Sequence, residues 1–140
     1  MKANIIYWSG TGNTEKMAQL ICEGVKSAGF NVVLKEVSEA TSEDAKDCDV
    51  LFLGCSSMGD EVLEETEFEP YMISIDSIIS DKKVALFGSY GWGDGEWMRN
   101  WQERVKKDGA NLFDEGLIIN ETPSGDDEDK CREFGKNAVK

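Results

Sequence analysis

The sequence predicts an α/β protein in which a five-stranded parallel sheet carries helices on both faces, a three-layer sandwich. Apolar runs that suit strands alternate with stretches of helical spacing along all 140 residues. The runs at 50–55 and 83–89 are apolar almost throughout, which is typical of parallel strands covered on both sides. No linker, repeat or low-complexity segment interrupts the alternation, so we expect one domain over residues 1–140.

The individual elements follow from these patterns. The predicted strands are 3–8, 31–37, 50–55, 83–89 and 111–119. A first helix begins near Glu15 and ends before Gly29, and its inward face carries Met17, Leu20, Ile21 and Val25. A short helix at 42–46 is expected to have Ser42 as its cap.

Three further helices complete the alternation. The third has Pro70 in its first turn and buries Phe68, Met72, Ile75 and Ile79. The fourth ends before Gly109 and buries Trp97, Met98, Trp101 and Val105. The last opens with the acidic run 126–129, which suits a helix N-terminus, and buries Cys131, Phe134 and Val139.

The composition excludes several kinds of chemistry. The chain has no histidine, which removes histidine-based acid–base catalysis, histidine-activated nucleophiles and histidine-ligated zinc. None of the four cysteines forms a C-x-x-C motif, so we expect buried, reduced thiols. No catalytic residue and no metal site is predicted. No apolar run is long enough to cross a membrane and the chain begins with a strand pattern, so we expect a cytoplasmic protein.

The charge of the chain is strongly acidic. Fifteen basic and twenty-eight acidic residues give a net charge of −13, and residues 47–81 contain ten acids and no lysine or arginine. Nucleic acid and anionic membranes are poor partners for such a surface. Two interpretations of the acidic stretch stay open: it aids solubility, or it steers a basic partner protein.

The strongest functional signal is the segment Ser-Gly-Thr-Gly-Asn-Thr at 9–14, between the first strand and the first helix. A helix N-terminus presents unpaired N–H groups and a partial positive charge, and glycines let the backbone approach an anion closely. The P-loop and dinucleotide signatures both fail at Glu15, where each requires glycine. We therefore predict a phosphate held by neutral donors; a plain strand-to-helix turn is the alternative.

Two more loops follow the carboxyl ends of the predicted strands 50–55 and 83–89. Because parallel strands end at the same edge of a sheet, we expect these loops to meet the first loop there. Trp92 lies between two glycines and can stack on a flat ring, whose other face Met58 can cover. These loops predict a flat aromatic ligand with a phosphate tail. The alternative is that Trp92 caps the core and Met58 fills a gap. Trp97 and Trp101 lie on an apolar helix stripe and are predicted core residues.

The three loops resemble those of the flavodoxin family, and the short-chain members in particular. The resemblance is carried by residues 7–15, 53–61 and 87–93, and it extends along the chain, more weakly at 31–48 and 110–128. It implies a flavodoxin-like fold with strand order 2-1-3-4-5 and the ligand at the switch in strand order, a rule of which flavodoxins are a standard example. The last strand has no room for the extra loop that interrupts it in long-chain members.

The resemblance also implies a function. It implies a monomeric, low-potential one-electron carrier that binds FMN noncovalently and cycles mainly between semiquinone and hydroquinone in place of ferredoxin. The phosphate would rest on 9–14 and the ring between Met58 and Trp92, with Tyr90 the weaker candidate for the outer ring cover. A carbonyl at the flavin edge maps onto Gly59, and a carboxylate near ring N3 maps onto Glu61. The implied partners are ferredoxin-type iron–sulfur or flavin oxidoreductases. The implied FMN-binding residues are Ser9, Gly10, Thr11, Gly12, Asn13, Thr14, Ser56, Ser57, Met58, Gly59, Asp60, Glu61, Ser89, Tyr90, Gly91 and Trp92.

Three other functions are alternatives to this one. An FMN-dependent NAD(P)H oxidoreductase on the same fold would need a second pocket, and no basic cluster is present to hold nicotinamide phosphates. A receiver domain would need an aspartate at the end of the third strand, where the chain has Gly54, Cys55 and Ser56. A binding module without a redox role would take up no FMN.

Overall fold

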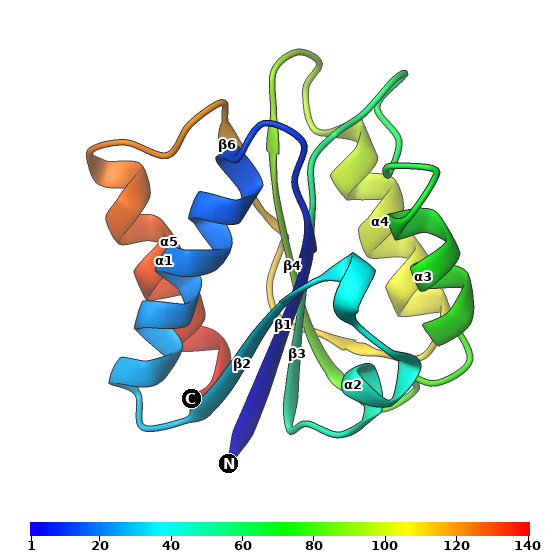
Figure 1. Ribbon diagram of the computed structural model, residues 1–140, viewed down its shortest axis with the longest axis vertical. Coiled ribbons are helices and arrows are strands. Elements are labelled where there is room, and N and C mark those ends of the chain that lie inside the picture. Colours follow the sequence, from blue (N-terminus) through cyan, green and yellow to red (C-terminus); the bar gives the residue numbers. More distant parts are fainter.

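The computed structural model describes residues 1–140 as a twisted parallel sheet between two layers of helices (Figure 1). The strand order is β2-β1-β3-β4-β5, with β6 also paired to β4, so the predicted order is confirmed. All of the pairings are parallel. The strands are β1 (Lys2–Trp8), β2 (Asn31–Glu36), β3 (Val50–Cys55), β4 (Lys83–Tyr90), β5 (Asn111–Leu112) and β6 (Leu117–Asn120).

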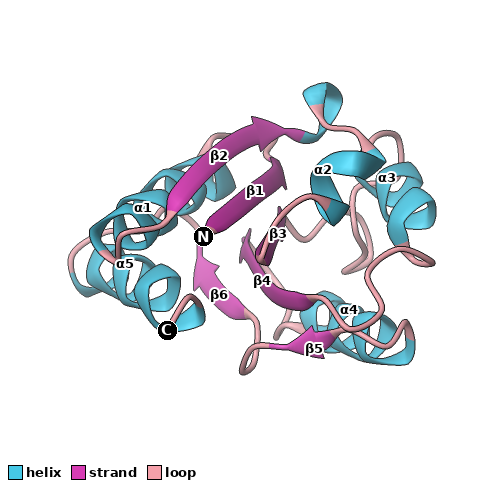
Figure 2. Ribbon diagram, turned by 90° about the horizontal axis from the view of Figure 1, so that it is seen from below, coloured by secondary structure: helices cyan, strands magenta, loops and turns pink.

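The helices divide between the two faces of the sheet, as the view along the strands shows (Figure 2). On one face lie α1 (Asn13–Ser27) and α5 (Asp126–Ala138). On the other lie α2 (Ser42–Lys46), α3 (Phe68–Ile75) and α4 (Glu96–Lys107), and a 3-10 turn, η1 (Val37–Glu39), follows β2. No helix is both long and apolar enough to cross a membrane.

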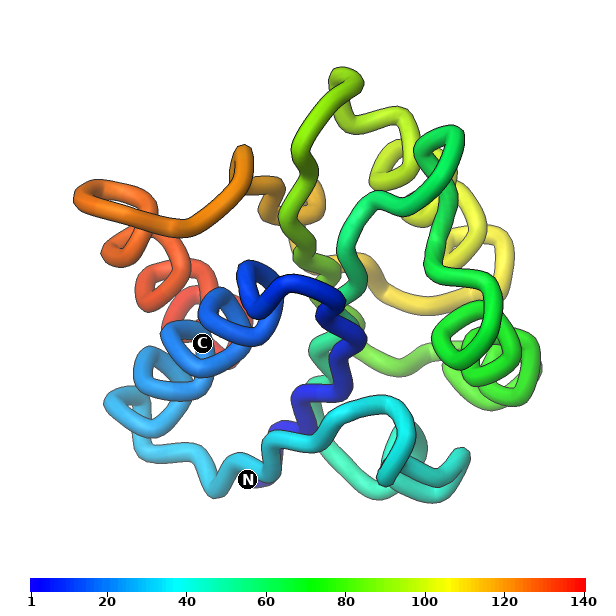
Figure 3. Tube along the Cα trace, turned by 45° about the horizontal axis from the view of Figure 1, so that its top comes forward, coloured from blue at the N-terminus to red at the C-terminus, as the bar shows by residue number.

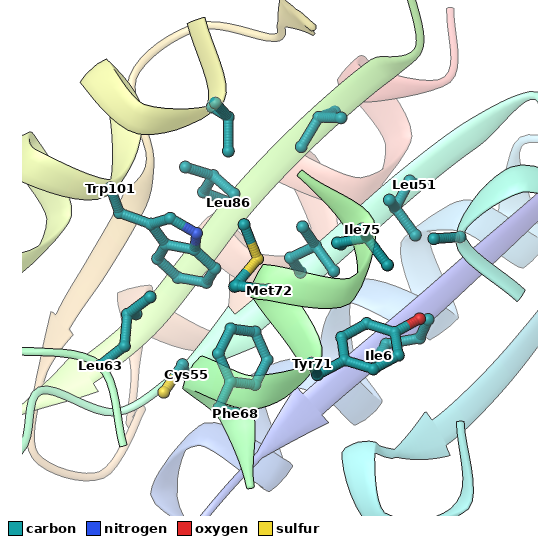
Figure 4. Close-up of a cluster of buried hydrophobic side chains, with 14 of the residues drawn as sticks. Ile6, Leu51, Cys55, Leu63, Phe68, Tyr71, Met72, Ile75, Leu86 and Trp101 are labelled. Atoms are coloured by element: carbon teal, nitrogen blue, oxygen red, sulfur yellow. The ribbon is translucent and has the colours of Figure 1, made fainter. Parts of the chain in front are cut away.

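Each face of the sheet has its own hydrophobic core. The core under α3 and α4 contains Trp101, which meets the ring of Phe68 edge-on with the ring centroids 5.4 Å apart (Figure 4). The core under α1 and α5 contains Phe52 and Phe87, both fully buried. The strands between the two cores are covered on both sides, which is why β3 is buried at all six positions. The predicted burial of Trp97 and Trp101 is confirmed.

The prediction of one continuous last strand at 111–119 is wrong. Both β5 and β6 pair with β4, but residues 113–116 leave the sheet between them. Asp114 adopts a left-handed φ of 51°, and the N–H of Gly116 turns to donate to the Gln102 side chain. Asp and Gly favour turns, so residues 113–116 form a turn although the sequence pattern suits a strand.

The cap of α2 also differs from the prediction. Thr41, one residue before Ser42, caps this helix through a reciprocal pair of hydrogen bonds with Asp44. Thr41 has the extended backbone that a cap requires, whereas Ser42 is already helical. The predicted end of α1 before Gly29 and of α4 before Gly109 agrees with the left-handed φ of both glycines.

Helices α1 and α5 approach each other unusually closely. A Cβ added to Gly24 of α1 would lie 2.0 Å from the Arg132 carbonyl oxygen of α5, and one added to Gly135 would lie 2.4 Å from that of Ile21. Only glycine fits at these two positions, because the obstructing atoms belong to the backbone. The helix that follows the first loop is thus fixed against the last helix of the chain.

Candidate flavin-nucleotide site

The three loops that follow β1, β3 and β4 meet at the carboxyl edge of the sheet, as predicted (Figure 3). Between them lies a cavity of about 310 Å³. Nine of the predicted site residues line it. They are Gly10, Thr11, Asn13, Ser56, Ser57, Met58, Ser89, Tyr90 and Gly91. The lining contains no lysine or arginine, so an anion here would be held by neutral donors, helix ends and backbone.

The first loop presents free N–H groups to this cavity. The amides of Gly10, Thr11 and Asn13 donate to no acceptor in the protein, whereas the Gly12 N–H donates to the Ser9 hydroxyl oxygen at 3.1 Å. Gly12 has a φ of 98°, a conformation that a side chain would resist, and it lets the chain turn directly into α1. Unpaired amides at a helix N-terminus are an anion-binding arrangement.

Thr14 joins the start of α1 to the loop after β3 and to the end of β4. Its side chain is fully buried, and its hydroxyl lies 2.7 Å from the Ser56 hydroxyl. The same oxygen accepts the Ser89 N–H at 3.2 Å. The Ser57 N–H in turn donates to the Ser89 carbonyl at 3.0 Å. Thr14 therefore does not line the cavity but positions the loops that do.

The loop after β3 is held by two buried carboxylates. The Glu61 carboxylate accepts the N–H groups of Gly95 and Glu96 at 3.1 and 3.0 Å, which caps the N-terminus of α4. Only its Oε1 is used in this way, and Oε2 has no hydrogen-bond partner in the protein. Glu64 caps α3 in the same manner, through the N–H groups of Glu67 and Phe68 at 2.7 and 2.9 Å.

The tip of this loop turns at Gly59. Met58 and Val62 exchange two backbone hydrogen bonds of 2.9 Å, which closes a tight hairpin around Gly59, Asp60 and Glu61. Gly59 has a φ of 50°, and an added Cβ would meet only the Val62 side chain at 3.9 Å. The backbone conformation at Gly59, and not crowding, is therefore what favours glycine there.

The aromatic residues at the end of β4 and in the loop after it occupy different places. Tyr90 lines the cavity and packs on Trp97, with the ring centroids 5.7 Å apart. Trp92 is 63% exposed and lies outside the cavity lining. Met58 is 39% exposed at the cavity wall. The alternative in which Trp92 caps the core and Met58 fills a gap is wrong, because both side chains are exposed.

The structure adds two residues to the cavity that the sequence did not suggest, Trp8 and Glu121. Trp8 is the last residue of β1 and packs over Gly10, where an added Cβ would lie 2.9 Å from its ring. Its position directly before the first loop could have indicated this role. Glu121 follows β6, and no local motif marks it. Of the predicted site residues, those outside the lining are Ser9, Gly12, Thr14, Gly59, Asp60, Glu61 and Trp92.

The cysteines take no part in the cavity lining. All four are free, and three are buried; Cys48 is half-buried. Burial raises the pKa of the Cys55 thiol, at the end of β3, to about 12, so this group stays protonated at neutral pH. No cluster of acidic or cysteine side chains has the arrangement of a metal site.

Open α/β sheets bind ligands at the switch in strand order, a rule of which flavodoxins are a standard example. Here the free amides of the first loop, the amide cradle, lie at that switch, which is the arrangement of a nucleotide-binding protein of the α/β class. The family model of the flavodoxins matches residues 5–135. The flavodoxin of Clostridium beijerinckii is 53% identical over 132 residues, which cover 94% of this chain and 95% of that protein.

Solved structures agree with this similarity. The solution structure of two-electron reduced Megasphaera elsdenii flavodoxin matches with a TM-score of 0.90 and 43% identity, over 98% of both chains. The crystal structure of oxidised flavodoxin 1 from Bacillus cereus matches with a TM-score of 0.89 and 28% identity, over 99% of this chain and 97% of that one. The chain belongs to the flavodoxin family.

Family membership confirms the expected cofactor and class. Flavodoxins bind FMN and carry electrons, so FMN is the cofactor and the protein is an electron carrier and not an enzyme. The residues around the cavity suit FMN. Three unpaired amides match a phosphate group, and exposed apolar side chains at the cavity wall and beside it match a flat ring.

Proposed function

We propose that residues 1–140 form one FMN-binding unit that works as a low-potential one-electron carrier in the cytoplasm. Bound FMN supplies the chemistry, taking up and releasing electrons one at a time. In this proposal the cofactor alternates mainly between its one-electron and two-electron reduced forms, in place of ferredoxin. The protein holds the cofactor, shields its ring and offers one edge to a partner.

The observation that carries this proposal is the set of unpaired amides at 10, 11 and 13 beside the cavity. A phosphate fits them because their N–H groups and the start of α1 favour negative charge without any neighbouring cation. The remaining cavity wall, from Ser56 to Met58 and from Ser89 to Gly91, would then line the ribityl chain and the ring edge.

The ring is proposed to lie between Met58 and Trp92. Both are large apolar side chains left in contact with water, and a ring between them would bury their exposed surface. The free Oε2 of Glu61 can accept the N–H of ring N3 while its Oε1 continues to cap α4. Gly59 and Asp60 would face the edge of the ring from the hairpin tip.

One FMN per chain is the expected stoichiometry, with riboflavin bound far more weakly. The unpaired amides of the cradle have no other acceptor in the protein, so loss of the phosphate removes several charge-assisted hydrogen bonds. Titration of the apoprotein, followed by flavin fluorescence, measures both affinities. Equal affinity for FMN and riboflavin would show that the cradle at 9–14 does not bind the phosphate.

The partners are proposed to be ferredoxin-type iron–sulfur or flavin oxidoreductases, met by a monomer through an acidic surface. Six of the ten acids in 47–81 have partners within the protein: Glu61 and Glu64 cap helices, Glu69 and Asp76 pair with Arg104, and Asp47 and Asp49 contact Lys2. The exposed acids on the loop after β3 are Asp60, Glu65 and Glu67. These lie in the same loop as Met58, so they suit a basic docking face around the ring.

Electron transfer to such a partner is expected to slow several-fold as salt rises from low ionic strength. Screening shortens the range of attraction to about 10 Å at 0.1 M, which weakens steering by Asp60, Glu65 and Glu67. Stopped-flow transfer rates across a salt series give the measurement. A rate that stays flat from the lowest salt upward would mean that the acids serve solubility alone.

A further inference from the structure

Helix α1 begins with a glutamate that does not cap it. Glu15 is the third residue of α1, a position from which a carboxylate commonly reaches back to the N–H groups at the start of its own helix. Asp44 does so at the third position of α2, where it accepts the Thr41 N–H at 2.8 Å. The Glu15 carboxylate accepts no N–H group, and the amides of Asn13 and Thr14 stay free. The start of α1 is therefore left open although an acid is present to close it.

A tyrosine of β1 binds the Glu15 carboxylate instead. The Tyr7 hydroxyl donates to Glu15 Oε2 at 3.0 Å. Tyr7 is 5% exposed and belongs to the core under α1 and α5, so packing fixes its ring and with it the place of the hydroxyl. Burial, together with the hydrogen bond to Glu15, raises the pKa of Tyr7 above its usual value, so the hydroxyl remains a donor at neutral pH.

The other charges around this contact are unfavourable for a free carboxylate. Glu36 lies opposite Tyr7 in the pairing of β1 with β2, and Glu39 ends the 3-10 turn that follows. Like charges repel, so a Glu15 carboxylate without the phenol is disfavoured on this side. The lysine that follows it in the chain is already paired with Glu128 at 3.0 Å. The free N–H groups at the start of α1, with their partial positive charge, are the favourable alternative.

The same N–H groups are the ones assigned to the FMN phosphate, and a carboxylate of the same helix competes for them at high effective concentration. We propose that Tyr7 keeps the first loop open for the phosphate by holding the Glu15 carboxylate away from it. Tyr7 lies outside the cavity lining, so it is a positioning residue that acts through Glu15. The inference rests on the proposed function, since it assumes that the first loop binds the phosphate of FMN.

The test compares FMN with riboflavin, which lacks the phosphate, in titrations of the complete apoprotein. Tyr7→Phe removes only the hydroxyl and keeps the ring in the core. Glu15→Gln, alone and combined with Tyr7→Phe, removes the competing charge and completes a double-mutant cycle. The matched control is Tyr71→Phe, because Tyr71 is also buried (Figure 4) and its hydroxyl donates to the Thr41 carbonyl at 2.8 Å, outside the cavity lining.

Tyr7→Phe is expected to weaken FMN binding about tenfold, because the released carboxylate then occupies the N–H groups that the phosphate needs. Riboflavin affinity stays unchanged, since riboflavin does not use these groups. In the double variant, FMN affinity returns to that of Glu15→Gln alone. Tyr71→Phe changes neither affinity. The ratio of FMN to riboflavin affinity and its rescue by Glu15→Gln separate the positioning role of Tyr7 from a merely structural one.

Three results would overturn the inference. An unchanged FMN affinity in Tyr7→Phe would show that the phenol does not restrain a competing anion. An equal loss of FMN and riboflavin affinity would assign the hydroxyl a structural role. A loss of FMN affinity that persists in the double variant would show that Tyr7 does not act through the Glu15 carboxylate. Equal affinity of the parent protein for FMN and riboflavin would instead overturn the proposed function, on which the inference rests.

Discussion

Trp97→Ala is expected to lower the free energy of unfolding by about 3–5 kcal/mol, the usual cost of truncating a buried aromatic side chain. Trp97 is 2% exposed, and its indole N–H donates to the Cys55 carbonyl at 3.1 Å. The substitution leaves a cavity next to Tyr90 and removes the hydrogen bond to the Cys55 carbonyl at the end of β3. We expect the loops of the site to loosen as a secondary effect.

Trp92→Ala is the matched control for this variant, since it removes the same atoms from an exposed position. Its effect on unfolding should stay within about 0.5 kcal/mol, as for other exposed substitutions. It should weaken FMN binding and shift both one-electron potentials. Urea unfolding of the apoproteins, with FMN titration alongside, distinguishes the two. A stable Trp97→Ala or an unfolded Trp92→Ala would reverse the roles assigned to these residues.

Glu64→Gln is expected to cost about 2–3 kcal/mol of stability, because charge-assisted hydrogen bonds to a buried group are the strong ones. The Glu64 side chain accepts the N–H groups of Thr66, Glu67 and Phe68 and the Thr66 hydroxyl. A glutamine keeps the shape but turns an NH₂ group towards these donors. Glu65→Gln, at the exposed neighbour, is the control and should change stability little.

The lowered pKa of Glu64 makes its contribution to stability depend on pH. Burial alone would raise the pKa of Glu64, but the hydrogen bonds from Thr66, Phe68 and Glu67 outweigh it and hold the pKa below its usual value. A lowered pKa in the folded state contributes stability above the unfolded value of about 4.3, and that contribution is lost as pH falls through the folded value. The stability difference between parent and Glu64→Gln should therefore shrink below about pH 4. A difference that is constant with pH would contradict this account.

The strands and the first loop could be predicted from sequence because their signals are local. An apolar run such as 50–55 predicts a strand, and a glycine pair before a helix predicts an anion-binding loop, from a few neighbouring residues. The meeting of the three loops followed from the parallel sheet alone, since parallel strands share one carboxyl edge. The roles of Trp97 and Trp101 followed from helical spacing, and both are buried.

The features that escaped prediction depend on distant partners. Glu61 was placed near the ligand by resemblance, but its cap on α4 joins residues 34 apart in the chain. The break at 113–116 depends on Gln102 and on the Met98 side chain beside Gly116. Glu121 reaches the cavity only because Ser89 and Tyr90 fix its backbone. The spacing of residues along the chain does not reveal such long-range contacts.

The close packing of α1 against α5 has a consequence for the order of folding events. At Gly24 the two helices meet across a separation of 108 residues, since the obstructing carbonyl belongs to Arg132. Contacts between residues so far apart in the sequence form late in folding, because closing a long loop costs more conformational entropy than closing a short one. The helix that presents the first loop is therefore expected to gain its support late, and tight cofactor uptake is expected to follow the docking of α5.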